Sequence, residues 1–324
     1  MKFKIIANLS AGKGSSKKLF AKAEKALTKS GIAYDVALSR YPWHAADLAQ
    51  QAVVAGYDVV VAAGGDGTVN EVLNGLLLAR DAELGTARLG ILPVGRGNDF
   101  SFGMGLPIRW TEAVKVLAGG YTRWIDVGRI CGGLYPAGRY FGNGVGIGFD
   151  ASVDFVATDM QSTGFISYLS AAIKTLAVDF QIQPLEITLD GQQFQQPTLM
   201  VSIMNGRRMG GGFLMAPDSR TDDGLFDVCI VGEVNQAKAL SILTAFISGQ
   251  QHRFKSVQTF RSSQVHIRAL SGIIPAHADG ETICTQAKEL HIELLPKQIE
   301  LICPAPVPER KGKPIILRRK KTKE

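Results

Sequence analysis

The sequence predicts a two-domain protein, in which a doubly wound parallel α/β domain precedes an antiparallel β sandwich or barrel. Three observations carry this prediction. A chain of 324 residues is long for one domain. Strand and helix patterns alternate through residues 1–125, as they do in a parallel sheet. In residues 126–296 the patterns are mainly strands, joined by turns rich in glycine and aspartate.

The first domain is expected to begin with a short apolar strand that ends in a loop. The helix after it has Leu19, Ala23 and Leu27 at helical spacing, and Gly31 follows as a stop signal. The third strand is apolar throughout, which is typical of a parallel strand covered on both faces. We expect strands over 3–9, 33–39, 58–65 and 87–95, and helices over 15–30, 43–56 and 68–77.

The second domain is expected to consist of short strands with two helical interruptions. We expect strands over 139–153, 184–194, 198–206, 225–234, 262–270 and 289–296, and helices over 164–178 and about 235–250. The domain boundary is placed near Asp126. Whether a segment of about 297–310 returns to the first domain stays open.

Composition and charge indicate a protein kept inside the cell, in the cytoplasm. No run of eighteen apolar residues occurs, and the N-terminus lacks the features of a secretion signal. Four cysteines without a CxxC pair argue against a zinc site and a disulfide framework. Most of the net charge of +7 lies in a basic tail, residues 310–324. This position favours an anionic membrane surface over nucleic acid, although a solvated tail is an equal alternative.

The stretch "AGGDGTVNEV" (63–72) carries the first functional signal. Gly64, Gly65 and Gly67 lie between a buried strand and a helix start, where free N–H groups can bind phosphate. Asp66 would repel phosphate unless a divalent cation lies between them, so the loop indicates a nucleotide with a metal ion. A tight turn with Asp66 as a helix cap is the alternative.

Three further stretches place acids where packing does not require them. "GILPVGRGNDF" (90–100) is a second strand that ends in a glycine-rich loop, and it carries Asp99. "RWIDVG" (123–128) has Asp126 in an apolar strand, where an unpaired charge is costly. "HADGETI" (277–283) sets Asp279 and Glu281 around a glycine. His277, at its start, is expected to be structural.

Together with "FGNGVGIGFDA" and "PDSRTDDGLFDV", these motifs resemble the soluble diacylglycerol kinase and lipid kinase family, whose relatives include sphingosine kinases. The resemblance implies an NAD-kinase-like nucleotide domain and the use of ATP and Mg²⁺. It implies Glu281 as general base, with Asp66, Asp99 and Asp126 around the catalytic Mg²⁺; for Asp126, a hydrogen-bonded acid at a domain junction is the alternative. The implied ATP-binding residues are Asn8, Ser39, Gly64, Gly65, Asp66, Gly67, Thr68, Val69, Asn70 and Arg96.

Two further implications of the resemblance concern metal and nucleotide. A second, structural Mg²⁺ would be held by Asp223 and by backbone carbonyls near Arg220 and Leu225, although a simple Asp-Gly turn is the alternative. Arg96 stands where the family commonly has a threonine. A long cation in place of a hydroxyl is not expected to keep the role of that threonine.

The resulting hypothesis is an ATP- and Mg²⁺-dependent kinase that phosphorylates a lipid hydroxyl, such as that of diacylglycerol. The helix over 164–178 could line an acyl channel, although ordinary core is the commoner role of such a stripe. Two alternatives stay open: an NAD kinase, and a lipid-binding regulatory protein without turnover, which Arg96 favours. The expected partner is a lipid at the inner membrane face, contacted peripherally through the basic tail. A homodimer is an open question.

Overall fold

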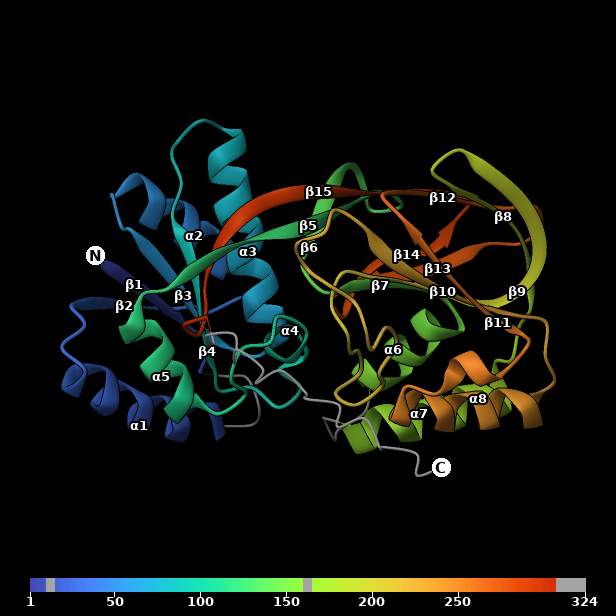
Figure 1. The fold of residues 1–324 in the computed structure, drawn as a ribbon, viewed down its shortest axis with the longest axis horizontal. Coiled ribbons are helices and arrows are strands. Elements are labelled where there is room, and N and C mark those ends of the chain that lie inside the picture. The colour runs from blue at the N-terminus through green and yellow to red at the C-terminus, as the bar shows by residue number, and fades with distance from the viewer. Residues whose placement is uncertain (10–14, 160–164, 307–324) are drawn as a thin grey trace, which may run out of the picture.

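The computed structural model describes residues 1–9, 15–159 and 165–306, and the basic tail therefore lies outside the described residues. An α/β domain and a β-rich domain lie side by side, and two long strands run across both (Figure 1). None of the helices in the described ranges has the length and apolarity needed to cross a membrane.

The first domain contains a parallel sheet in the order β2-β1-β3-β4. Its strands are β1 (Phe3–Ala7), β2 (Tyr34–Leu38), β3 (Val59–Gly64) and β4 (Arg88–Pro93). Its helices are α1 (Ser15–Lys29), α2 (His44–Val54), α3 (Asp66–Asp81), α4 (Asp99–Gly103) and α5 (Trp110–Gly119).

Alternate residues of β3 explain why helices cover both faces of this sheet. Val60 and Ala62 pack into a core with α2 and α3. Val59, Val61 and Ala63 pack into the opposite core with α1 and α5. All six residues of β3 are buried, which accounts for its unbroken apolar sequence.

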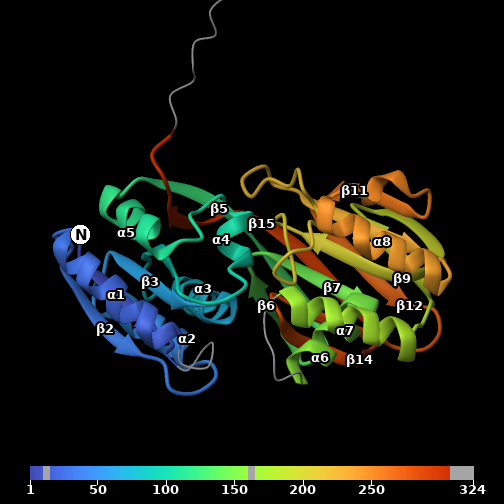
Figure 2. The same ribbon diagram turned by 90° about the horizontal axis from the view of Figure 1, so that it is seen from below.

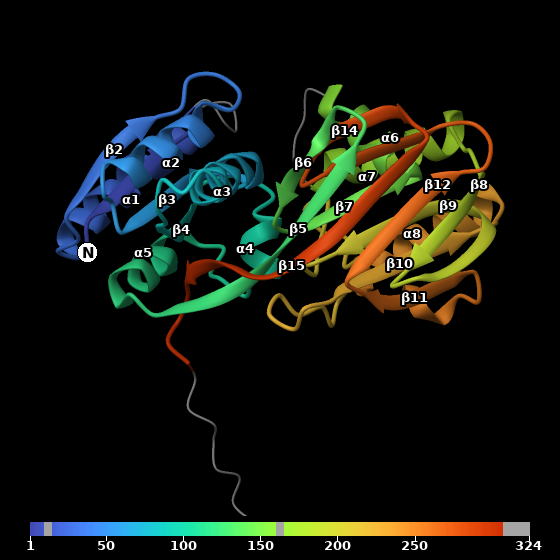
Figure 3. The same ribbon diagram turned by 90° about the horizontal axis from the view of Figure 1, so that it is seen from above.

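Two antiparallel strands join the domains: β5 (Thr122–Gly132) and β15 (Glu289–Ile302). Near its end β15 also pairs in parallel with β4, through Leu301 and Leu89, and becomes the last strand of the first sheet. Figure 3 shows both strands running between the two bodies. The expected boundary at Asp126 therefore falls inside β5, in a continuous hydrogen-bonded strand.

The second domain is antiparallel, with the strand order β14-β13-β7-β9-β8-β12-β15. β10 and β11 extend from β9, and β6 pairs with β5. The strands are β6 (Tyr135–Phe141), β7 (Gly144–Gly148), β8 (Gln183–Leu189), β9 (Gln192–Met204), β10 (Phe226–Gly232), β11 (Val257–Ser262), β12 (Gln264–Ala269), β13 (Ile274–Ala278) and β14 (Glu281–Ala287).

Three helices lie together on one side of this domain (Figure 2). They are α6 (Phe149–Asp159), α7 (Phe165–Val178) and α8 (Gln236–Ser248). One apolar core lies between the strands, and a second lies beneath the helices. The predicted fold class, a doubly wound α/β domain with an antiparallel β domain, is confirmed.

Two local predictions are wrong or incomplete. Residues 149–153 were expected to continue a strand but form the first turns of α6. The strand ends because Gly148 has φ +76°, and Phe149 and Val153 then bury one helical face. Two short helices between β4 and β5, α4 and α5, were not among the predicted elements.

Candidate active site

The two glycine-rich turns meet at the carboxyl edge of the parallel sheet. The N–H groups of Val94 and Gly95 donate to the carbonyl of Gly64, at 3.1 and 3.0 Å. A Cβ at position 95 would lie 2.3 Å from the Cα of Gly65, so glycine is required for this contact. Two loops that are thirty residues apart in sequence thus form one surface.

The other residues predicted to bind ATP lie around this edge. Asn8 follows β1 and donates its N–H to Ala63, and Ser39 follows β2 and donates to Ala7. Arg96 is exposed in the turn after β4. Gly67 lies beside the second domain, because a Cβ at this position would be in ordinary van der Waals contact with Oε1 of Glu281, at 3.7 Å.

Thr68, Val69 and Asn70 are buried in the first turns of α3. Asn70 connects the domains: its Nδ2 donates to Oδ2 of Asp279 at 3.0 Å, and its Oδ1 accepts from Nη2 of Arg139 at 3.1 Å. The structure therefore gives the Asn70 side chain a role between domains, where the sequence suggested a contact with ATP.

Asp66 and Asp99 line a shared acidic cavity of about 150 Å³. The cavity wall also includes Asp154, His277 and Asp279. Oδ1 of Asp66 accepts the N–H of Phe100 at 2.9 Å. Burial raises the pKa of Asp66 to about 7, and repulsion from the carboxylate of Asp99 contributes.

Asp99 differs because a cation from the second domain already contacts it. Nε of Arg208 lies 2.6 Å from Oδ1 of Asp99, and the N–H of Gly211 donates to Oδ2 at 2.7 Å. Arg208 also donates to the carbonyl of Gly97 and lies over the ring of Phe102. The loop between β9 and β10 is thereby fixed against the GNDF turn.

Of these two carboxylates, Asp66 fits a magnesium ion directly, whereas both oxygens of Asp99 already accept from Arg208 and Gly211, so that Asp99 would reach the ion through water. Carboxylate oxygens are the ligands that Mg²⁺ prefers, and this ion usually keeps several waters. A nearby cation would also relieve the repulsion that raises the pKa of Asp66.

Glu281 begins β14, directly after Gly280 of the cavity wall, and is half-buried. Burial raises its pKa, whereas Arg139, with Nη2 at 3.9 Å from Oε2, opposes the rise. A carboxylate in such a setting can accept a proton at neutral pH. Arg139 itself is buried between the rings of Trp43 and Tyr135, at 4.3 and 4.8 Å from their centroids.

Asp279 holds the turn before Glu281 in place. It has φ +51°, and its carboxylate accepts the N–H groups of Gly142, Asn143 and Gly144 at 2.8 to 2.9 Å. These bonds fix the turn between β6 and β7 against the turn between β13 and β14. Asp279, the first acid of the Asp-Gly-Glu turn, therefore positions the turn that carries Glu281.

Asp126 is not among the residues that line the acidic cavity with Asp66 and Asp99. It is fully buried in β5, and its two carboxylate oxygens accept the N–H groups of Gly224 and Lys297 at 2.8 Å. The geometry agrees with the alternative given for it, a hydrogen-bonded acid at the domain junction.

The loop expected to hold a second metal does not fit one in this structure. Asp223 forms an ion pair with Arg261, and Arg220 forms another with Asp222 at 3.3 Å. The N–H of Leu225 donates to Oδ1 of Asp223. Asp222 and Asp223 are thus already paired with arginines, so a further cation at these two acids gains little.

Arg139, Arg208 and His277 are the site residues that sequence reasoning missed or left as structural. His277 is buried, and both of its ring nitrogens lack a hydrogen-bond partner among the described residues. Burial would lower the pKa of His277, but the carboxylates of Asp154 and Asp150 outweigh it and raise the pKa to about 9. The protonated ring thus offers N–H donors beside the acidic cavity.

The fold and the site define a two-domain protein of the kinase type, in which glycine-rich turns and acids of one domain meet a glutamate of the other. A family model for the diacylglycerol kinase catalytic domain matches residues 2–130. A model for the YegS C-terminal NAD kinase beta sandwich-like domain matches residues 143–303. The chain belongs to the family of diacylglycerol kinases and YegS-like lipid kinases.

Curated relatives cover most of the chain. A diacylglycerol kinase of Mycobacterium tuberculosis (strain H37Rv) is 30% identical over 258 residues, or 78% of this chain and 79% of the relative. A diacylglycerol kinase of Bacillus subtilis (strain 168) is 27% identical over 281 residues, or 86% of this chain and 89% of the relative.

Solved structures share the fold. A diacylglycerol kinase from Bacillus anthracis (strain Sterne) aligns with TM-score 0.68 at 22% identity, covering 94% of this chain and 97% of that one. An NAD kinase from Archaeoglobus fulgidus, solved in complex with ATP, aligns with TM-score 0.51 at 13% identity and covers 93% of each chain. The expected NAD-kinase-like architecture is therefore confirmed.

Proposed function

We propose that this protein is an ATP- and Mg²⁺-dependent lipid kinase, which transfers the γ-phosphate to the hydroxyl of diacylglycerol or a related lipid. The observation that carries the proposal is a wall shared by two cavities. Tyr168 and Met209 line the acidic cavity, and they also line an apolar cavity beneath α6, α7 and α8. An acidic, metal-compatible site thus adjoins a place suited to acyl chains.

The apolar cavity is narrow, about 30 Å³, and almost all of its wall is hydrocarbon or sulfur. Its side chains come from all three helices, including Ala172 of α7 and Ala239 of α8. An acyl chain has to displace side chains as it enters. Burial of each of its methylene groups contributes about 0.8 kcal/mol, which offsets the free-energy cost of that displacement. The acyl channel that the sequence suggested at 164–178 would thus be formed by α7 together with α6 and α8.

Polar groups lie between the two cavities, where the lipid backbone would pass. The hydroxyl of Tyr168 donates to Oδ1 of Asp150 at 3.0 Å, and Nε2 of His277 lies 3.8 Å from Oδ2. The protonated ring of His277 would donate to carbonyl oxygens of the acceptor, because ester carbonyls are hydrogen-bond acceptors next to the reacting hydroxyl.

In the proposed reaction Glu281 removes the proton of the lipid hydroxyl. Arg139 lies 3.9 Å from the carboxylate of Glu281 and attracts it, and Asn70 orients Arg139 by accepting its hydrogen bond. Asp66 and Asp99 would bind Mg²⁺, directly or through water, and the bound ion would offset charge on the transferred phosphoryl group. Closure of the two domains around these groups would exclude water, which would otherwise accept the phosphoryl group.

The test is phosphoryl transfer from [γ-³²P]ATP with Mg²⁺ to a lipid panel and to NAD, with products separated by thin-layer chromatography. We expect label in phosphatidic acid or a related phospholipid. Label confined to NADP would establish the NAD kinase alternative, and no label in any product would favour the lipid-binding alternative. Ala239→Phe, which narrows the apolar cavity, should raise the KM for lipid, while Ala237→Phe on the exposed side of α8 is the matched control.

A further inference from the structure

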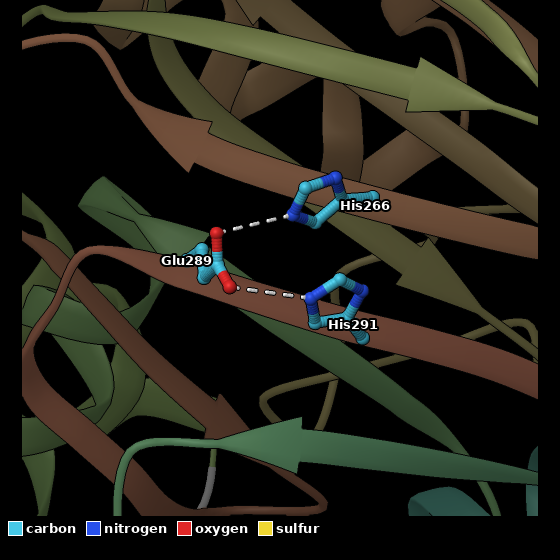
Figure 4. A group of neighbouring side chains, drawn as sticks. All are labelled: His266, Glu289 and His291. Carbon is cyan, nitrogen blue, oxygen red and sulfur yellow. Dashed lines mark hydrogen bonds and ion pairs between the residues drawn. The ribbon is translucent and has the colours of Figure 1, made fainter.

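A cluster of two histidines and a glutamate lies away from the acidic cavity. His266 is on β12, and Glu289 and His291 are on β15 (Figure 4). His266 and His291 are directly opposite each other in the antiparallel pair. Glu289 precedes His291 by two residues, so it points to the same face of the sheet. The three side chains therefore converge by strand register.

The distances within the cluster match those around a metal ion. Nε2 of His266 lies 3.7 Å from Oε2 of Glu289, and Nε2 of His291 lies 3.5 Å from Oε1. Two ligands bound at 2.0–2.1 Å to a tetrahedral ion are about 3.3 Å apart. Each of the three residues offers one ligand atom, and these atoms all lie within 4.8 Å of one another. Among the described residues, this cluster is the one group of three or more His, Cys, Asp or Glu residues that meets this condition.

Within the cluster, Nε2 of His291 and Oε1 of Glu289 form a hydrogen bond at the limiting distance of 3.5 Å. A separation of 3.7 Å is too long for a hydrogen bond, and Nε2 of His266 has no hydrogen-bond partner among the described residues, although it is shielded from solvent. The two imidazole rings are stacked, with centroids 4.0 Å apart and an angle of 7° between their planes.

We propose that His266, Glu289 and His291 bind one late first-row transition ion, of which Zn²⁺ is the type. Imidazole nitrogen suits Zn²⁺, Cu²⁺ and Ni²⁺, whereas Mg²⁺ prefers oxygen ligands. All three side chains keep some exposure to solvent, so water can complete the coordination. This site is separate from the proposed catalytic Mg²⁺ and does not rest on the proposed function.

Such an ion would link two strands that matter for the whole molecule. β15 pairs with β12 at the cluster, with β5 along its length and with β4 at its far end. A metal bond between β12 and β15 would hold the strand that joins the two domains. An ion that binds only the folded state raises the free energy of unfolding.

The test is calorimetric titration of metal-free full-length protein with ZnCl₂ in a buffer that does not bind metals. Cys131, a partly exposed thiol paired with His291 across the strands, is first replaced by serine so that it cannot compete for Zn²⁺. We expect one Zn²⁺ per chain, a higher Tm with Zn²⁺, and no displacement by excess Mg²⁺.

Single substitutions separate this site from adventitious binding. His266→Gln and His291→Gln should each weaken Zn²⁺ binding by at least about ten-fold. His252→Gln, at an exposed histidine outside the cluster, is the matched control and should bind as the parent does. Circular dichroism checks that each variant is folded. Zn²⁺ binding that is absent, or equal in all three variants, would overturn the proposal.

Discussion

Replacement of Asp66 by asparagine should stabilise the metal-free protein, and the gain should depend on pH. Asparagine removes the charge but keeps a side-chain oxygen that can accept the N–H of Phe100. The wild-type carboxyl carries a cost because burial and the carboxylate of Asp99 disfavour its ionised form.

The magnitude follows from the pKa of Asp66. It is about 7 in the folded chain, against about 3.9 in an unfolded one. Between these values the unfolded chain has lost the proton and the folded chain has kept it, so the free energy of unfolding falls as pH rises. The fall is about 1.4 kcal/mol per pH unit. From pH 5 to pH 7 it reaches at most about 3 kcal/mol, since two pH units contribute about 1.4 kcal/mol each, and the solvent contact of the partly buried Asp66 reduces this value.

The assay is urea denaturation of wild type and Asp66→Asn at pH 5 and pH 7, without metal. The stability advantage of the variant should be larger at pH 7, by up to about 3 kcal/mol. Added Mg²⁺ should narrow the gap by stabilising the wild type alone. An advantage that is equal at both pH values would refute the reasoning about Asp66.

Three further predictions concern residues outside the acidic pair. Arg139→Gln should move the acid limb of the pH–rate profile to higher pH, because Arg139 lowers the pKa of Glu281; an unmoved limb would contradict this role. Asp126→Asn should cost about 2 to 4 kcal/mol in urea denaturation, since an amide group would face a backbone N–H donor; wild-type stability would contradict that. Deletion of residues 310–324 should weaken sedimentation with anionic vesicles, and unchanged sedimentation would exclude the tail as a membrane contact.

The parallel sheet and its glycine-rich turns could be predicted because their signals are local. A fully apolar strand followed by glycines and an acid describes the end of β3 and the start of α3 without distant information. The meeting of Gly65 with Gly95 is then a consequence of β3 and β4 being neighbours.

The cross-domain contacts could not be predicted in this way. Arg139 and Asn70 are 69 residues apart, and Arg208 and Asp99 are 109 residues apart. No spacing in the sequence indicates these pairs. The sequence could not decide the role of Asp126, because an acid in an apolar strand can accept backbone N–H groups as readily as it can bind a metal. The apolar strand around Asp126 indicated that its carboxylate has hydrogen-bond partners. The fold shows that these partners are the N–H groups of Gly224 and Lys297.

The most direct test of the proposed reaction compares Glu281→Gln with wild type in single-turnover transfer from [γ-³²P]ATP to diacylglycerol in mixed micelles. Glutamine keeps the shape of the side chain but cannot accept the proton. We expect the affinity for ATP to be unchanged and transfer to fall by about 100-fold or more. Transfer at the wild-type rate would contradict the assignment of Glu281 as the base, and with it the meeting of the two domains in one catalytic site.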